Sequence, residues 1–185
     1  MLLIWPVLIG VIIGFLRGGG IAQLGALSLK ATWLIPVSLV IQLLIFPLID
    51  PQPIIAWGTQ YFHIGSYLLL VVFIVINRRI MSLVSAGAGM MANFITIVVN
   101  GGYMPVSVTA LSRTGAEAVI THLQQYGYWG NVMLMSEKTA LNFLGDILYL
   151  PPFIPFSVPF SIGDVIISIG IGWLIVQGMG RRAKN

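Results

Sequence analysis

Five apolar stretches dominate the pattern of hydrophobic and polar positions along the chain. They cover about residues 2–16, 31–49, 64–76, 80–99 and 162–179. A helix crosses a bilayer with roughly 20 apolar residues, in a range of about 17–25, so the first and third stretches are short for a span. The pattern predicts an all-α fold: a polytopic membrane helix bundle of about five transmembrane helices, forming one integral membrane domain over residues 1–185.

Composition supports this class. The chain is 58% hydrophobic and only 8% charged, whereas about a quarter of the residues in a soluble domain are charged. The lipid bilayer is therefore the expected main partner. The basic residues lie at the ends of the apolar stretches, as membrane topology requires, so we expect no nucleic-acid partner. With no cysteine, two histidines and scattered carboxylates, we expect no metal site and no cofactor.

Lysine and arginine predict the orientation. Arg17 and Lys30 bracket the first loop, Arg78 and Arg79 separate the third and fourth stretches, and the tail holds Arg181, Arg182 and Lys184. Five spans place all three groups on one side of the membrane, and the positive-inside rule makes that side cytoplasmic. We therefore expect a multi-pass protein of the bacterial inner membrane with its N-terminus outside and its C-terminus inside. Because Arg17 follows the first apolar run, we interpret that run as a retained helix and not as a removed signal peptide.

Small residues recur at helical spacing in three of the stretches. They form the pairs Gly10 and Gly14, Ser85 and Gly89, and Ser168 and Gly172. Small residues four positions apart let helices approach closely in lipid. We expect these pairs to pack within the chain, and the pattern leaves the oligomeric state open.

The long segment over residues 100–161 is expected to form an amphipathic cap on the outer face. The first predicted helix begins at "TGAE", where Thr114 and Glu117 have capping-box spacing, and ends at Gly127. The second is predicted from near Ser136 to just before Pro151. There Lys138, Asn142 and Asp146 would form one polar stripe at a spacing of four residues.

"NGGYMPVS" follows the fourth stretch and has two interpretations. The turn can be a helix C-cap with an exit turn, because asparagine and glycine tolerate positive φ there. It can also expose its backbone to a site at the outer face. On the second interpretation Asn100, Gly101 and Gly102 are candidate binding residues.

Two of the five acidic residues, Asp146 and Asp164, follow a glycine beside very apolar segments. "SIGD" is typical of a capping box with Ser161 as the N-cap, and Asp146 can belong to a solvated face. Alternatively the two carboxylates meet in a low-dielectric place, where one keeps a proton. An acid and a base then stand together, which is the machinery of aspartyl hydrolysis.

"NGGYMPVS", "LGDILYLP" and "FSIGDVIISIG" carry a resemblance over essentially the whole chain. The chain resembles a bacterial family of small polytopic membrane proteins of unknown function, which shares an NGG-x-MP turn and a terminal SIGD helix. This resemblance implies the class of protein and no activity.

The C-terminal third is similar to lipoprotein signal peptidase. The matching residues are Gly130 and Asn131, then Asp146, then Asp164 within "FSIGD". The resemblance implies that Asp146 and Asp164 are a catalytic pair at the outer face. The family's Asp-Arg after Gly-Asn is absent here. Asn131, together with Lys138 and Asn142 from the polar stripe, completes the set of candidate binding residues.

Three functions follow from these observations. The first is an accessory or structural subunit that packs against other membrane protein subunits. The alternative is an Asp-dependent hydrolase at the outer membrane face, so the sequence leaves open whether the protein is an enzyme. A transporter or channel ranks last, because no ionisable residue lies at a predicted helix midpoint.

The predicted orientation can be tested with reporter fusions. A reporter fused after Gly102 should lie outside the membrane and one fused after Lys184 inside, because the basic groups share one side. Both reporters on the same side would contradict the five-span arrangement.

Overall fold

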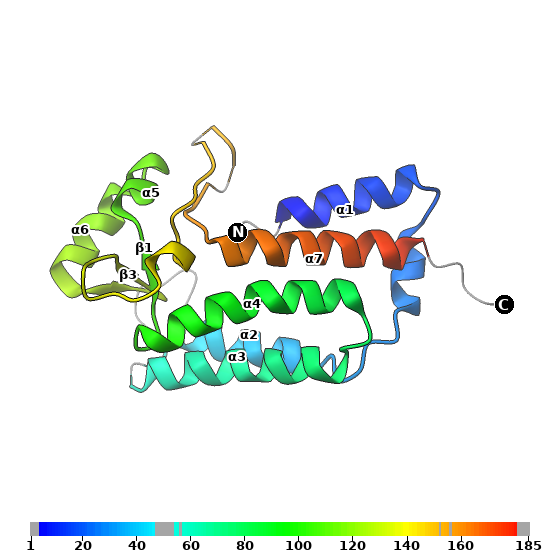
Figure 1. Ribbon diagram of the computed structural model, residues 1–185, viewed down its shortest axis with the longest axis horizontal. Helices are drawn as coiled ribbons and strands as arrows, with labels where there is room; N and C mark the ends of the chain where they lie inside the picture. The colour runs from blue at the N-terminus through cyan, green and yellow to red at the C-terminus, as the bar shows by residue number, and fades with distance from the viewer. Residues whose placement is uncertain (1–3, 47–53, 56, 152, 156, 181–185) are drawn as a thin grey trace.

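Apolar helices run side by side through the described part of the protein (Figure 1). The computed structural model describes residues 4–46, 54–55, 57–151, 153–155 and 157–180. The helices are α1 (Ile4–Leu16), α2 (Leu34–Ile45), α3 (Thr59–Ile76), α4 (Met81–Val99) and α7 (Ile162–Met179). Each predicted apolar stretch thus overlaps one of these helices. Residues 2–3 and 47–49 of those stretches, and the basic tail, lie outside the described residues.

Three of these helices, α3, α4 and α7, are long and apolar enough to cross a membrane, which fits a membrane protein. The other two, α1 and α2, are apolar but have only 13 and 12 residues. The α3 helix begins at Thr59, five positions before the apolar stretch begins. Its first turns are polar because they face the outer segment, where His63 bonds to the carbonyl of Gly102.

The α7 helix lies between α1 and α4, and α2 packs against α3 (Figure 1). Small residues make these contacts close. A Cβ added to Gly10 would lie 3.0 Å from the Gly172 carbonyl oxygen, and one added to Gly89 would lie 2.8 Å from Ile166 Cβ. Gly14 faces Met179. The expectation that Gly10, Gly14 and Gly89 pack within the chain is therefore confirmed.

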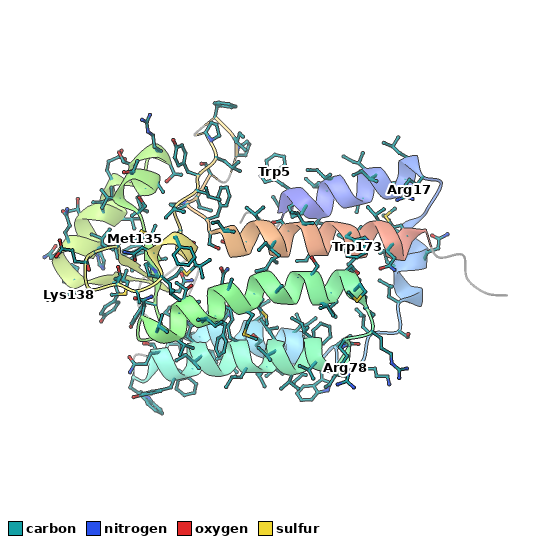
Figure 2. All side chains as sticks on the ribbon, in the orientation of Figure 1. Trp5, Arg17, Arg78, Met135, Lys138 and Trp173 are labelled. Carbon is teal, nitrogen blue, oxygen red and sulfur yellow. The ribbon has the colours of Figure 1, made fainter. Side chains whose placement is uncertain are left out.

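Along the chain, consecutive apolar helices alternate in direction. In Figure 1, α1, α3 and α7 run one way and α2 and α4 the other. Arg17 and Arg78 consequently lie at the same end of the bundle (Figure 2). At that end, the 3-10 helix η1 (Ile21–Ala26) sits against the last turns of α7, where Leu24 contacts Gly178. The Lys30 backbone N–H donates to Asn77 Oδ1 over 2.8 Å and joins the two loops.

The segment after α4 forms a small α/β cap at the opposite end of the bundle (Figure 1). It contains β1 (Met104–Val106), α5 (Val108–Arg113), α6 (Glu117–Tyr126), β2 (Tyr128–Trp129), β3 (Val132–Leu134) and the 3-10 helix η2 (Asn142–Leu144). The sheet order is β1-β3-β2, with β1 parallel to β3 and β2 antiparallel to it. Val106, Leu111 and Leu123 form its core. The sequence pattern missed this sheet because strands of two or three residues show no usable alternation.

The first predicted cap helix is confirmed as α6, and Gly127 ends it with φ of 86°. Its predicted capping box is wrong. The N-cap is Ala116, which makes no side-chain cap bond. Thr114 Oγ1 instead donates to the Leu111 carbonyl over 2.8 Å at the end of α5.

The second predicted cap helix, from Ser136 to Pro151, is wrong. The segment is a loop with one short 3-10 turn, η2. Local side chains take the backbone groups that a helix needs, since Thr139 Oγ1 donates to the Ser136 carbonyl and accepts from the Ser136 N–H. The distant strand β1 takes another of these backbone groups, because the Asp146 N–H donates to Pro105 O over 2.8 Å. The predicted polar stripe of Lys138, Asn142 and Asp146 therefore does not form.

Two glycines of α7 should respond oppositely to alanine. The new Cβ in Gly170→Ala would overlap the Ala86 backbone of α4, whereas in Gly172→Ala it would lie 3.5 Å from the Pro6 carbonyl oxygen, an ordinary contact. Overpacking costs roughly 1–3 kcal/mol, and alanine is a better helix former than glycine by up to about 1 kcal/mol. Thermal unfolding in detergent should show a lower melting temperature for Gly170→Ala and an equal or higher one for Gly172→Ala. Equal losses in both variants would contradict the close α4–α7 contact.

Candidate functional site: a carboxyl pair at the outer end

Asp164 occupies the third position of α7 and is fixed by a capping box. Its backbone N–H donates to Ser161 Oγ over 2.9 Å, and its Oδ2 accepts from the Ser161 N–H over 3.0 Å. The predicted capping box is thus confirmed. The carboxylate also lies at the positive end of the helix dipole, which favours a negative charge there.

Asn93 joins this cap from the neighbouring helix α4. Its Nδ2 donates to Asp164 Oδ1 over 2.8 Å, while its Oδ1 accepts from Ser161 Oγ–H over 2.8 Å. Asn93 is buried and Ser161 is fully buried. The two side chains can meet only because Gly163 has no Cβ where the Asn93 amide lies. Both oxygens of Asp164 therefore accept hydrogen bonds, which suits the ionised carboxylate and fixes its orientation.

Asp146 reaches the same region from the cap. Its backbone pairs with β1, with its N–H donating to Pro105 O and its carbonyl accepting from the Ser107 N–H over 3.0 Å. Its side chain is half-buried. Among the described residues, the carboxyl group has no hydrogen-bond partner, so only the backbone of Asp146 is held by hydrogen bonds.

The Asp146 carboxyl has an unusual proton affinity. Burial raises its pKa from the ordinary value of 3.8 to about 8, and the negative charge of Asp164 adds to the rise. The charge of one predicted site residue therefore acts on the carboxyl of the other. At neutral pH this pKa leaves Asp146 mostly protonated.

Two aromatic side chains of α3, Tyr67 and His63, contact each other near the outer end of the bundle. The Tyr67 side chain lies within electrostatic range of the Asp164 and Asp146 carboxyl groups. It stacks on Phe94 at 5.8 Å and meets the His63 ring edge-on at 5.3 Å. Sequence analysis missed Tyr67 and His63. The available signal was two polar rings four residues apart on one side of an apolar helix.

The NGG turn holds the cap on the bundle. Asn100 Nδ2 donates to the carbonyls of Thr96 and Ala140, and its Oδ1 accepts from the Ala140 N–H over 2.8 Å. Gly101 and Gly102 both have positive φ. A Cβ on Gly102 would overlap Gln60, and the Gly102 carbonyl accepts from His63 Nδ1–H over 2.7 Å. The interpretation as a helix C-cap with an exit turn is confirmed, because Asn100 is the C-cap of α4. The interpretation as a turn that lines a site stays a prediction.

The remaining candidate residues lie in the cap. Asn131 and Lys138 are exposed. The Asn142 amide bonds within its own loop, where its Nδ2 donates to the Ser136 carbonyl over 3.2 Å. Among the described residues, no three histidine, aspartate or glutamate side chains gather closely enough to hold a metal ion.

Residues 26–176 match a family model described as a family of unknown function, DUF5317. No curated protein and no solved structure matches the chain. The match agrees with the resemblance to a family of unknown function. The similarity to lipoprotein signal peptidase stays a prediction.

The raised pKa of Asp146 makes stability depend on pH. A folded-state pKa above the ordinary value means that the folded protein binds this proton more tightly than the unfolded chain does. Its contribution is complete below pH 3.8 and is lost as the pH rises through about 8. The melting temperature of the wild type should therefore fall over that window, while Asp146→Asn should remove this part of the dependence. Identical profiles for the two proteins would contradict a buried, proton-binding Asp146.

Proposed function

Because the chain belongs to this family of unknown function, we propose a function from the geometry of its site: a membrane-embedded hydrolase with Asp146 as general acid and Asp164 as general base. One observation carries the proposal. The pKa of Asp146 is raised to about 8 by burial and by the Asp164 charge, so one carboxyl holds a proton while the other accepts hydrogen bonds on both oxygens. Two carboxyls with separated proton affinities are the arrangement that acid–base catalysis needs.

The reaction would cleave an ester or amide bond. Asp164 takes a proton from water, and the hydroxide oxygen bonds to the carbonyl carbon. When the bond to the leaving group breaks, Asp146 gives its proton to the leaving oxygen or nitrogen. The proton on Asp164 then returns to Asp146 through solvent, which restores the starting state. Asn93 and Ser161 hold Asp164 in place for the first step.

The resemblance to lipoprotein signal peptidase supports this chemistry. Asp146 and Asp164 match the two catalytic aspartates of that family by position, and Gly130 and Asn131 match its Gly-Asn motif. The resemblance implies a catalytic pair at the outer membrane face. That placement suits a carboxyl pair at the end of the bundle next to the cap.

We place the protein in the bacterial inner membrane with five spans and the cap outside. The alternating directions of the five helices support this arrangement (Figure 1). So does the location of Arg17 and Arg78 at the end opposite the cap (Figure 2). The positive-inside rule makes that basic end cytoplasmic.

An accessory subunit would need a surface for its partner. The small-residue faces that a partner helix could use are largely occupied within the chain, where Gly10, Gly89 and Gly170 contact α7 or α4. We therefore favour the hydrolase. A transporter stays the least favoured function. In α3, α4 and α7 the only charged residue is Asp164, which lies at the outer end of α7, whereas ion pathways usually need charged groups deeper in the membrane.

Hydrolysis can be tested on the purified protein in lipid nanodiscs. The probes are a fluorogenic lipid-modified peptide, the same peptide without lipid, and a fluorogenic acyl ester. Asp146→Asn and Asp164→Asn should each lower the rate by about 100-fold or more, the usual range for removing a general acid or base. Glu117→Gln, an exposed acid on α6, is the matched control and should keep the wild-type rate. The wild-type rate should fall as the pH rises through about 8, because Asp146 then loses the proton it must donate.

A titration of Asp146 tests the coupling without any substrate. Carbon-13 NMR of labelled aspartate should show one carboxyl that titrates near pH 8 and disappears in Asp146→Asn. Asp164→Asn should lower the pKa of Asp146, because it removes a nearby negative charge. An unchanged pKa in Asp164→Asn, or full hydrolysis by Asp146→Asn, would contradict the acid–base pair.

A further inference from the structure

A buried polar network joins α2, α3 and the NGG turn. Gln42 Nε2 of α2 donates to Ser66 Oγ of α3 over 3.0 Å, and Ser66 Oγ–H donates to the His63 carbonyl over 2.7 Å. Ser38 Oγ–H of α2 donates to the Ser66 carbonyl, and the His63 ring donates to the Gly102 carbonyl. Ser38, Ser66 and His63 are all buried. Polar side chains inside a membrane bundle are costly and usually functional, so this network needs an explanation.

The His63 ring is fixed at the outer end of α3. Because a carbonyl oxygen only accepts, Nδ1 carries the hydrogen in the 2.7 Å bond to Gly102. The ring meets Phe46 edge-on at 4.9 Å and Tyr67 edge-on at 5.3 Å. Gly102 can lie this close to α3 because it has φ of 98° and lacks a Cβ, which would overlap Gln60. The bond therefore holds the turn against α3.

The turn leads directly into the strand with which Asp146 pairs. Strand β1 begins at Met104, two positions after Gly102. Pro105 O of β1 accepts from the Asp146 N–H over 2.8 Å, and the Ser107 N–H donates to the Asp146 carbonyl over 3.0 Å. A displacement of the turn from α3 would therefore move β1 and the Asp146 backbone with it.

The base of the proposed pair is held separately from the acid. Asp164 is placed within the bundle by its capping box and by its bond from α4, whereas Asp146 is placed by the cap. The separation of the two carboxyls thus depends on how the cap sits on the bundle. From α3, two side-chain hydrogen bonds fix this: the 2.7 Å bond of His63, and a 3.4 Å bond between the Thr59 and Tyr103 hydroxyls, which is weaker by its length.

We propose that His63 is a positioning residue for the carboxyl pair: its Nδ1–H holds the Gly102 carbonyl and, through β1, sets the place of Asp146 relative to Asp164. The inference deepens the proposed function and rests on it for the effect on hydrolysis, because it names the residue that aligns the acid with the base. Its effect on the two carboxyls needs no substrate and can be measured alone.

Carbon-13 NMR of labelled aspartate can test this alignment. The quantity is the change in the pKa of Asp146 that Asp164→Asn causes, called here the Asp164 effect, which reports how closely the two carboxyls are held. The Asp164 effect should be smaller in a His63→Phe background than in the wild type. Phenylalanine keeps an aromatic ring beside Phe46 and Tyr67 but cannot donate to the turn.

Two conservative variants separate the hydrogen bond from the ring. His63→Asn should restore most of the Asp164 effect, because its Nδ2 is attached to Cγ as Nδ1 is and can donate to the same carbonyl. His63→Gln places its amide where Nε2 lies and should behave like His63→Phe. His122→Phe makes the same change on α6, where the histidine ring contacts Tyr126 and Trp129 instead of the turn, and should match the wild type.

Hydrolysis gives the second measurement. His63→Phe should lower kcat by roughly tenfold to a hundredfold with little change in KM, because a displacement of about 1 Å between aligned groups has an effect of this size. His63→Asn should recover the rate. If the wild type hydrolyses none of the probes, the proposed function fails, and the Asp164 effect still decides whether His63 aligns the carboxyls.

Melting temperatures in detergent distinguish alignment from stability. If His63→Phe fails to fold, the comparison of His63→Asn with His63→Gln takes its place. A lower melting temperature in His63→Phe with an unchanged Asp164 effect would show that the bond only stabilises the cap, and would overturn the proposal. An equal Asp164 effect in His63→Asn and His63→Gln would also overturn it, because the position of the donor would then not matter.

Discussion

The close approach of α7 to α4 is the contact on which the rest of the structure depends. Gly163 and Gly170 on α7 face Asn93 and Ala86 on α4, and a Cβ at either glycine would overlap its neighbour. At this distance the Asn93 amide reaches both Ser161 and Asp164. A wider spacing would leave a buried amide and a buried hydroxyl without partners, which is unfavourable in any apolar surrounding. The packing of α7 on α4 and the orientation of the Asp164 carboxylate therefore depend on each other.

Two asparagines connect the loops to the bundle in the same way at its opposite ends. Asn77 at the end of α3 accepts from the Lys30 N–H and donates to the Lys30 carbonyl. Asn100 at the end of α4 does the same with Ala140. Each amide also donates to a carbonyl of its own helix, at Phe73 or Thr96. One neutral side chain thereby satisfies terminal helix carbonyls and holds a distant segment in register.

Sequence features that act locally predicted most of the bundle. Apolar runs located the helices, and "SIGD" gave the cap of α7 because a capping box involves residues three positions apart. The position of Asp146 beside β1 could not be predicted from local features, because its backbone pairs with Pro105 and Ser107, about forty positions earlier. The pairing of Met104 with Val132 spans 28 positions and is also beyond the reach of a local pattern. The sequence named both carboxyls as candidates, but the contributions of Asn93 and Tyr67 depend on helix packing that no local pattern encodes.

The short length of α1 and α2 has a consequence for the surrounding bilayer. At 1.5 Å per residue, helices of 13 and 12 residues are about 20 and 18 Å long, whereas the hydrocarbon core is about 30 Å thick. In the proposed five-span arrangement, lipid beside the described parts of these two helices would meet less apolar length than lipid beside α4. Such hydrophobic mismatch is relieved by local thinning of the membrane. The protein would then deform the bilayer unevenly around its circumference and favour thinner membranes over thicker ones.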